Sequence, residues 1–320
     1  MTAPATPTPA VAPEAAAPEQ ARGRRAPAVR RRPSRDAIEN RVLAVLRPLI
    51  IVALLVAAVF PFYYMVVLSF RSLSSVVQDP GALWVRPEDM DWNTYASVLK
   101  PVSEGGQGFL VFMRNSLLVA AGTVVLALLV SIPGAYAVSR LNFFGRRQIS
   151  ALFLAVYFFP SILLAVPLFV FFTRIGLRGS LVGLLIVYVS QVAAVSIYML
   201  RNYFDTIPAS LEEAAAIDGC TRLQAMRKIS LPLAMPAIVS NGLFIFMIAW
   251  NEFLFALLFL IERRDRWTVS LGLSQLSGSI EVPTTVLMAG SALLTVPIIV
   301  LFFASERLLV GGLTAGAEKG

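Results

Sequence analysis

Few residues in this chain could do chemistry. The 320-residue sequence contains no His and a single Cys, Cys220, so it predicts no His-based catalytic triad, no Cys/His metal site and no disulfide framework. Two polar features remain. Asn251 and Glu252 lie inside a long apolar stretch, and Glu213–Pro236 is a polar segment between two apolar stretches. Asn251 and Glu252 could contact a solute inside a membrane. The polar segment could be the site on which a soluble partner exerts force.

The composition indicates a membrane protein. Hydrophobic residues make up 57% of the chain and charged residues 14%, whereas a soluble domain carries roughly 25% charged residues. Spanning a bilayer core takes about 20 residues of helix. Six apolar runs approach or exceed that length: 48–70, 115–138, 149–173, 181–200, 237–260 and 286–304. The sequence therefore predicts an all-α membrane protein with six transmembrane helices.

The N-terminal segment differs from the rest of the chain. Residues 1–40 are rich in Ala, Pro and Arg and lack apolar periodicity, so they cannot bury enough surface to offset their ordering entropy. We predict a disordered basic tail at 1–40 and a membrane domain at 41–320. A secretory signal is disfavoured, because the apolar run after Arg47 is too long for such a signal and no cleavage site follows it.

The distribution of positive charge predicts an orientation. Of the 27 Lys and Arg residues, nine lie at or before Arg47. If the N-terminus lies inside, 18 of the 27 fall on the inner side, as the positive-inside rule requires. Both termini are therefore predicted to be cytoplasmic. The cluster Arg263, Arg264 and Arg266 runs against this trend, and the net charge of +8 is read as topogenic and not as a nucleic-acid surface.

The polar segment is patterned as two short helices joined by a tight turn. Ser210–Glu213 and Thr221–Gln224 both have the form of a capping box. Gly219 lies between them, where a left-handed residue ends a helix, and Pro232 and Pro236 are expected to end the second helix. An amphipathic helix lying on the inner leaflet is the alternative, but the caps and the small residues of the first helix favour a rigid peg that fits a partner protein.

The order of residues in this segment resembles a known signature. E-A-A at Glu213, three residues, Gly219, nine residues, Ile229, one residue and Leu231-Pro232 is similar to the EAA motif of bacterial ABC importer permeases. The resemblance implies a MetI-like permease bundle, with a core at about 110–308 and a cytoplasmic coupling helix-turn-helix, here called the coupling segment, at 205–236. The residues that it implies for coupling to an ATPase are Glu213, Ala214, Ala215, Asp218, Gly219, Ile229, Leu231 and Pro232.

Further stretches narrow the resemblance. The segments 115–141, 176–188 and 201–215 resemble the permease core, and 250–257 and 311–320 resemble the maltose-type carbohydrate subfamily, in particular the smaller permease of its pair. That family implies a sugar importer in the cytoplasmic membrane whose partners are a second permease, two ATP-binding subunits and an extracellular solute-binding protein. The ATPases bind ATP, so this chain needs no cofactor. The C-terminal residues implied to reach the ATPase interface are Gly312, Thr314, Gly316 and Gly320.

The intramembrane polar pair leaves two readings open. Glu252 lies about 22 Å along the fifth run at 1.5 Å per residue, and an ionisable group at that depth should face protein or water. Asn251 and Glu252 could line the translocation path, or Glu252 could be a buried structural partner. Gln191, Ser190 and Ser196 in the fourth run are weaker candidates for the path.

The source of energy separates the functional alternatives. The chain lacks the G-x-x-x-x-G-K-[ST] phosphate-binding loop, so energy must come from another subunit. An ion-coupled secondary transporter is the alternative function, but it would be expected to carry several intramembrane carboxylates. No catalytic constellation is visible, so an enzyme is not expected. The transported sugar itself is not encoded in this sequence.

Overall fold

A computed structural model describes residues 35–279 and 281–317, with side chains described for 42–153, 155–279 and 281–307. Every regular element within these ranges is helical, which confirms the predicted all-α fold. Of the predicted disordered tail, residues 1–34 lie outside the described residues. Residues 35–40 instead form the first turns of helix α1 (Arg35–Ser69), so the prediction of disorder is wrong for them.

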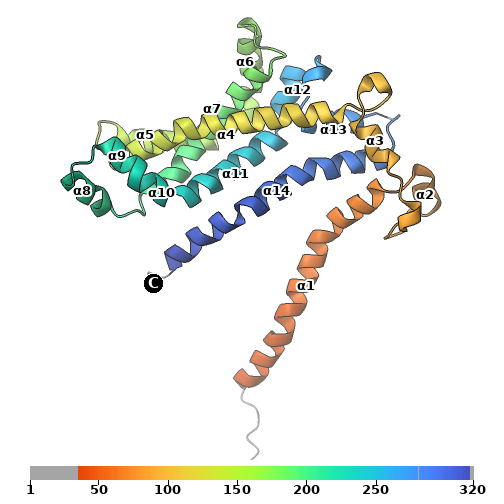
Figure 1. Cartoon of the computed structure of the whole chain (residues 1–320), viewed down its shortest axis with the longest axis horizontal. Helices are drawn as coiled ribbons and strands as arrows, with labels where there is room; N and C mark the ends of the chain where they lie inside the picture. The colour runs from red at the N-terminus through yellow and green to blue at the C-terminus, as the bar shows by residue number, and fades with distance from the viewer. Residues whose placement is uncertain (1–34, 280, 318–320) are drawn as a thin grey trace, which may run out of the picture. The chain divides into compact units, whose positions relative to one another are not determined.

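The chain forms two units, one ending at Ala57 and the other beginning at Ala58. The first unit contributes the N-terminal part of α1, whose side chains from Val42 to Ala57 are exposed. Apart from Arg47 they are apolar, which suits contact with lipid. The second unit contains all of the other helices (Figure 1).

Four long helices form the framework of the second unit. Their bounds, with those of two shorter helices beside them, are α4 (Phe109–Arg140), α7 (Leu181–Phe204), α11 (Met235–Asn251), α14 (Thr284–Ala317), α12 (Leu254–Leu260) and α13 (Val269–Ser277). Helix α4 packs along α7 and α11, and α11 packs along α14 (Figure 1). Phe112, Tyr188 and Trp250 are buried in one core cluster. Leu200 and Phe204 are buried in a second cluster nearer the C-terminal end of α4.

The number of membrane-spanning helices lies between four and six. Within the described residues, four helices are long and apolar enough to cross a membrane: Val42–Ser69, Phe109–Arg140, Leu181–Phe204 and Thr284–Arg307. Two further spans are each made of a bent pair of helices. One pair is α5 (Arg146–Phe158) with α6 (Ser161–Arg174), and the other is Arg222–Leu233 with Met235–Asn251.

The third predicted run, 149–173, is not one continuous helix. Helix α5 ends at Phe158 and α6 begins at Ser161, with a bend of 91° between them. The cause is Pro160, since a proline disfavours helical geometry in the residue before it, and Phe159 is extended with ψ 124°. Pro167, by contrast, lies inside α6.

The fifth predicted run, 237–260, is also interrupted. Helix α11 ends at Asn251, Glu252 is extended with φ −64° and ψ 131°, and α12 begins at Leu254. A carboxylate favours this break because it can accept hydrogen bonds from the free N–H groups at the start of the next helix. The expectation of one unbroken helix through Glu252 is therefore wrong.

The two ends of α4 contact different parts of the chain. Near its N-terminal end, the Asn115 side-chain amide donates to the carbonyl oxygens of Asp265 (3.0 Å) and Trp267 (3.1 Å). At its C-terminal end, Arg140 contacts Glu212 of α8 (Ala209–Ile217), and this end of α4 lies near α8 and α9 (Arg222–Ala225) (Figure 1). Twenty-five residues of helix cover about 37 Å, more than the roughly 30 Å of a hydrocarbon core.

The remaining elements are short. They are α2 (Leu73–Gln78), α3 (Asn93–Leu99), α10 (Leu231–Leu233), a π-helical turn at Met226–Ser230 and 3-10 turns at Pro87–Asp89, Val102–Glu104 and Arg264–Arg266. Helix α3 packs against α14 and the start of α4, so it lies at the end of the bundle away from α8 (Figure 1).

The separation of these two ends predicts opposite exposure across a membrane. In a Cys220→Ala background, Ile217→Cys and Arg264→Cys should react with a membrane-impermeant maleimide from opposite sides, since both side chains are exposed. The measurement is labelling of intact cells compared with inside-out vesicles. Reaction of both thiols from the same side would contradict the arrangement.

Candidate functional site

The first helix of the coupling segment begins earlier than its sequence indicated. Helix α8 spans Ala209–Ile217 and its N-cap residue is Pro208, with φ −58°. Ser210 is already inside the first turn, so it cannot act as the N-cap, and the predicted Ser210–Glu213 capping box is wrong. The fixed φ of proline sets the entry into the helix in place of a side-chain cap.

The turn after α8 has the predicted geometry. Gly219 adopts a left-handed conformation with φ +83°, and the Cys220 N–H donates to the Ala215 carbonyl (2.9 Å), as in a glycine C-cap. The second capping box is also confirmed: Thr221 Oγ1 accepts from the Gln224 N–H (3.3 Å) and Gln224 Oε1 accepts from the Thr221 N–H (2.8 Å). Residues 217–224 are thus fixed by local bonds.

The second helix ends at Leu233, between the two prolines that were predicted to end it. Helix α9 passes through the π-helical turn into α10, and the path then bends by 74° at Ala234 into α11. Pro232 lies one residue before the end of this helix, and Pro236 lies in the first turn of α11, where a missing N–H costs nothing. The coupling segment therefore leads through this bend directly into a membrane helix, and the predicted end of the second helix at Pro232 and Pro236 is confirmed to within one residue.

The structure divides the predicted coupling residues between surface and interior. Those with exposed positions are Glu213, Ala214, Asp218, Gly219 and Pro232, while Ile229 and Leu231 are half-buried. Ala215 is buried, at 6% exposure. Its small side chain therefore serves the packing of α8 on the second helix, where Ala225 is also buried. Ala214 is exposed and leaves bare helix surface toward solvent.

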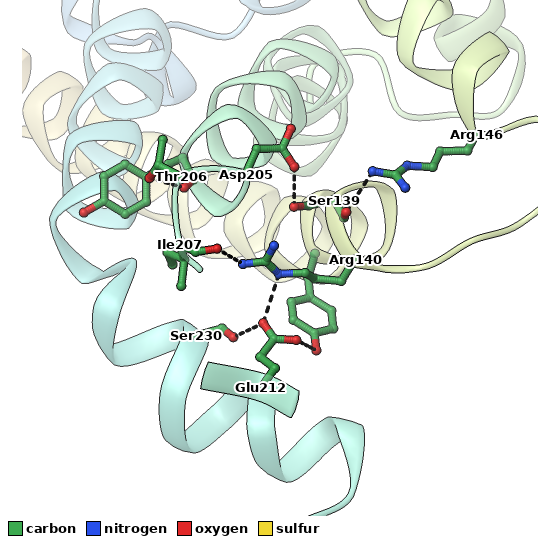
Figure 2. A network of polar contacts seen from close by, with 10 residues as sticks. Ser139, Arg140, Arg146, Asp205, Thr206, Ile207, Glu212 and Ser230 are labelled. Carbon is green, nitrogen blue, oxygen red and sulfur yellow. Dashed lines mark hydrogen bonds and ion pairs between the residues drawn. The ribbon is translucent and has the colours of Figure 1, made fainter. Parts of the chain in front are cut away.

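Glu212, which the sequence analysis did not select, holds α8 in place (Figure 2). Its Oε1 accepts from Arg140 Nε (3.0 Å) and from Ser230 Oγ (2.5 Å), and its Oε2 accepts from the Tyr136 hydroxyl (2.9 Å). We call Glu212, Arg140, Tyr136 and Ser230 the anchor cluster. The ion pair is largely buried, with side-chain exposures of 15% for Glu212 and 13% for Arg140. The anchor cluster joins α8 both to the end of α4 and to the π-helical turn.

A second set of bonds ties α4 to the end of α7. The Arg140 guanidinium also donates to the Ile207 carbonyl (2.6 Å), and Ser139 Oγ donates to Asp205 Oδ1 (2.6 Å). Arg146 donates to the Ser139 carbonyl (2.8 Å). Figure 2 shows these groups converging between the helix ends. Hydrogen bonds and the Arg140–Glu212 ion pair therefore hold the ends of α4 and α7 and helix α8 together.

A recess of about 300 Å³ lies beside the anchor cluster. Glu213, Ala216, Cys220 and Arg222 line it together with members of the anchor cluster. It opens on the side of α8 that carries the predicted coupling residue Glu213. A side chain from a partner protein could enter it.

No pattern within the coupling segment marks Glu212 as the anchor. Glu212 and Glu213 are adjacent and equivalent in type, and the capping-box reading drew attention to Glu213. Their difference comes from which one faces Arg140, a residue 72 positions earlier in the chain. The one available signal was Arg140, a basic residue directly after the apolar run 115–138. It did not indicate which acidic residue it would pair with.

Glu252 has a structural role in the break of the fifth run. Its Oε1 accepts from the Phe255 N–H (2.8 Å), and its Oε2 accepts from the Ala256 N–H (3.2 Å) and the Tyr188 hydroxyl (2.5 Å). It therefore caps α12 and links it to α7. Asn251 is exposed and its amide donates back to the Met247 carbonyl (2.9 Å). The geometry favours the structural reading of Glu252.

The predicted C-terminal interface residues lie in or beyond α14. Gly312, Thr314 and Gly316 belong to this helix, which runs to Ala317. Gly320 lies outside the described residues.

Comparison with known proteins assigns the family. Residues 127–314, more than half of the chain, match the family described as "Binding-protein-dependent transport system inner membrane component". An inner membrane ABC transporter permease protein, YcjP, of Escherichia coli (strain K12) is 38% identical over 266 residues, 83% of this chain and 93% of that protein. The trehalose/maltose transport system permease protein MalG of Thermococcus litoralis is 35% identical over 289 residues, covering 89% and 99%.

A solved structure extends the likeness to the fold. The crystal structure of a bacterial ABC transporter involved in the import of the acidic polysaccharide alginate contains a chain that is 25% identical, with a TM-score of 0.71, over 84% of this chain and 97% of that one. The protein thus has the fold of an ABC importer permease.

The chain belongs to the family of binding-protein-dependent transport permeases of the inner membrane. It is a multi-pass membrane component of an importer and not an enzyme, which confirms the resemblance found in the coupling segment. The alternative of an ion-coupled secondary transporter is set aside, because this family works with a binding protein and a partner ATPase.

The anchor cluster predicts different effects for two adjacent glutamates. Glu212→Ala leaves Arg140 largely buried without its carboxylate, which should cost about 2–4 kcal/mol. Glu213→Ala changes an exposed residue and should cost no more than about 0.5 kcal/mol. Thermal unfolding of the purified protein in detergent should show a midpoint lowered by several degrees for the first variant. Equal midpoints for the two would contradict the anchoring role.

Glu252 is expected to stabilise the fold because its carboxylate caps the start of α12. Glu252→Gln can satisfy fewer of the three donors that the carboxylate accepts, so the variant should lose about 1–2 kcal/mol. Asn251→Ala is the neighbouring control and should have a small effect. Melting temperatures measured in one detergent decide the matter, and a stable Glu252→Gln variant would show that the cap is dispensable.

Proposed function

We propose that this chain is one of two different permease subunits of a sugar importer, and that two ATP-binding subunits drive it through α8. A solute-binding protein delivers the sugar from outside, and both termini lie in the cytoplasm. The single observation that carries this proposal is the exposed helix α8, fixed by a left-handed turn and anchored to a membrane-spanning helix.

The surface of α8 and its turn suits docking to a partner protein. Ile217 is 87% exposed, Leu211 42% and Leu223 53%. The charged residues Glu213 and Asp218 are exposed beside them. Exposed apolar side chains rimmed by charge are typical of an interaction site, and rigid local structure lowers the entropy cost of binding. The ATPase is the cytoplasmic partner that this family requires.

The bonds of the coupling segment supply a route for force. A displacement of α8 acts on α4 through Glu212, Arg140 and Tyr136. It also acts on α11, because α9 continues through α10 into that helix. The two helices pack against each other. Closure of the ATPase dimer would therefore move α4 and α11 together as it moves α8.

The length of α14 supports a second contact with the ATPases. Thirty-four residues of helix extend for about 51 Å, which exceeds the roughly 30 Å hydrocarbon core. The C-terminal turns that contain Gly312, Thr314 and Gly316 can therefore project from the membrane on the side of α8. We propose that they and Gly320 reach the ATPase interface.

The substrate class rests on the relatives. One is a trehalose/maltose permease and the related solved transporter imports a polysaccharide. The chain covers nearly the full length of both proteins. A carbohydrate is therefore the substrate class that we propose for this importer.

A matched pair of glycine variants tests the coupling role. Gly219→Val and Gly145→Val each place a β-branched residue at positive φ, +83° and +86°, with open space around the new side chain. Each should therefore suffer similar strain of about 1–2 kcal/mol. Gly145 begins α5 at the same end of the bundle but lies outside the turn after α8. Only Gly219→Val should uncouple ATP hydrolysis from uptake.

The measurement is sugar imported per ATP hydrolysed, in proteoliposomes that contain the assembled transporter and its binding protein. Gly219→Val should lower this ratio severalfold while Gly145→Val stays near wild type. Equal ratios in both variants would remove the turn from the coupling role. Wild-type uptake that needs an ion gradient and no ATP would overturn the proposal as a whole.

A further inference from the structure

A cavity of about 240 Å³ lies among α5, α6, α7, α11 and α12. It is separate from the recess beside α8. Tyr157 and Phe159 line it on one side, Ser190 and Gln191 of α7 on another, and Phe244 of α11 on a third. None of the residues that line it is charged.

Both interrupted spans border this cavity. Phe159 and Ser161 flank Pro160 at the bend between α5 and α6, and Phe255 follows the break at Glu252. Irregular backbone at membrane depth is tolerated where it is buried in protein or lines a water-filled cavity. Discontinuous membrane helices also build the substrate sites of many transporters. The position of the cavity therefore fits a place on the translocation path.

The polar groups of the cavity suit a ligand with hydroxyl groups. Gln191 lines it, and Gln191 Nε2 is buried without a hydrogen-bond partner among the described residues. A buried unpaired amide is unfavourable, so a bound partner group would stabilise it. Ser190 Oγ donates to the Val187 carbonyl (2.7 Å), which leaves its lone pairs to accept a hydrogen bond.

The aromatic groups suit the apolar face of the same ligand. Tyr157 is 55% exposed and Phe159 51% exposed, so both rings are accessible in this subunit. A sugar ring has C–H faces that pack on aromatic rings and hydroxyls that bond to amide and hydroxyl groups. The absence of charge along the lining disfavours an ion or an acidic sugar. The volume lies below the roughly 300 Å³ at the lower end for drug-sized ligands, which suits one ring.

We propose that this cavity is a subsite for one uncharged sugar ring on the translocation path, with Gln191 as its hydrogen-bond partner and Tyr157 as its stacking surface. The proposal rests on the proposed function, since it assigns a sugar contact to this subunit of the importer.

The test measures sugar binding to the assembled transporter in detergent without the solute-binding protein, by saturation-transfer NMR with glucose, maltose and trehalose as probes. Gln191→Leu should raise the dissociation constant by about three- to tenfold, the loss of one hydrogen bond. It should not lower thermal stability, because the amide nitrogen has no partner to lose. Gln275→Leu, the same change in α13 outside the cavity, should leave binding unchanged.

A second pair of variants tests the stacking role of the Tyr157 ring. Tyr157→Leu should weaken binding by a similar factor, whereas Tyr157→Phe keeps the stacking surface and should bind nearly as wild type does. An unchanged dissociation constant in both Gln191→Leu and Tyr157→Leu would overturn the subsite. So would a transporter that binds none of the three probes in detergent yet imports one of them with ATP, since lipid or detergent would then fill the cavity.

A parallel uptake assay separates this proposal from the one on which it rests. ATP-driven uptake of a probe by the wild-type assembly, together with no effect of the cavity variants on binding, would remove the subsite alone. Failure of the wild-type assembly to import any of the three probes with ATP would instead count against the carbohydrate importer, and the subsite would fall with it.

Discussion

The carboxylate of Glu212 is the contact on which the coupling segment depends. It receives hydrogen bonds from α4 and from the π-helical turn at the same time (Figure 2). Without it, α8 would be held by its flanking chain and by the small contact at Ala215. The force transmission that we propose for α8 requires a stiff base, and a largely buried charge with three donors provides one because each lost bond leaves an unpaired group behind.

In the two interrupted spans, polar groups compensate for breaks in the helices. Pro160 and Glu252 each end a helix at membrane depth, where free backbone groups are costly. The cost at Glu252 is offset by its own carboxylate, which accepts from the first N–H groups of α12 and from Tyr188. These breaks leave space between neighbouring helices, and the cavity lined by Gln191 occupies that space.

The turn and the second helix cap of the coupling segment could be predicted from the sequence because they involve residues a few positions apart. The left-handed Gly219 and the box at Thr221–Gln224 follow from propensity alone. The same reasoning failed at Ser210, where Pro208 took the N-cap position and moved the helix start by two residues. It held at the end of the second helix, which falls at Leu233 between Pro232 and Pro236.

Taken alone, the amino-acid sequence determined the helical class, the membrane setting, the family and the turn that ends α8. These depend on composition, on apolar runs and on spacings within about 20 residues. The tertiary structure decided which of two adjacent glutamates is the anchor, that Ala215 is buried, and that Gln191 and Tyr157 share a cavity. The choice of anchor and the shared cavity depend on contacts between residues 34 to 76 positions apart, and the energy of a long-range contact is set by the packing of both partners, which no local pattern records.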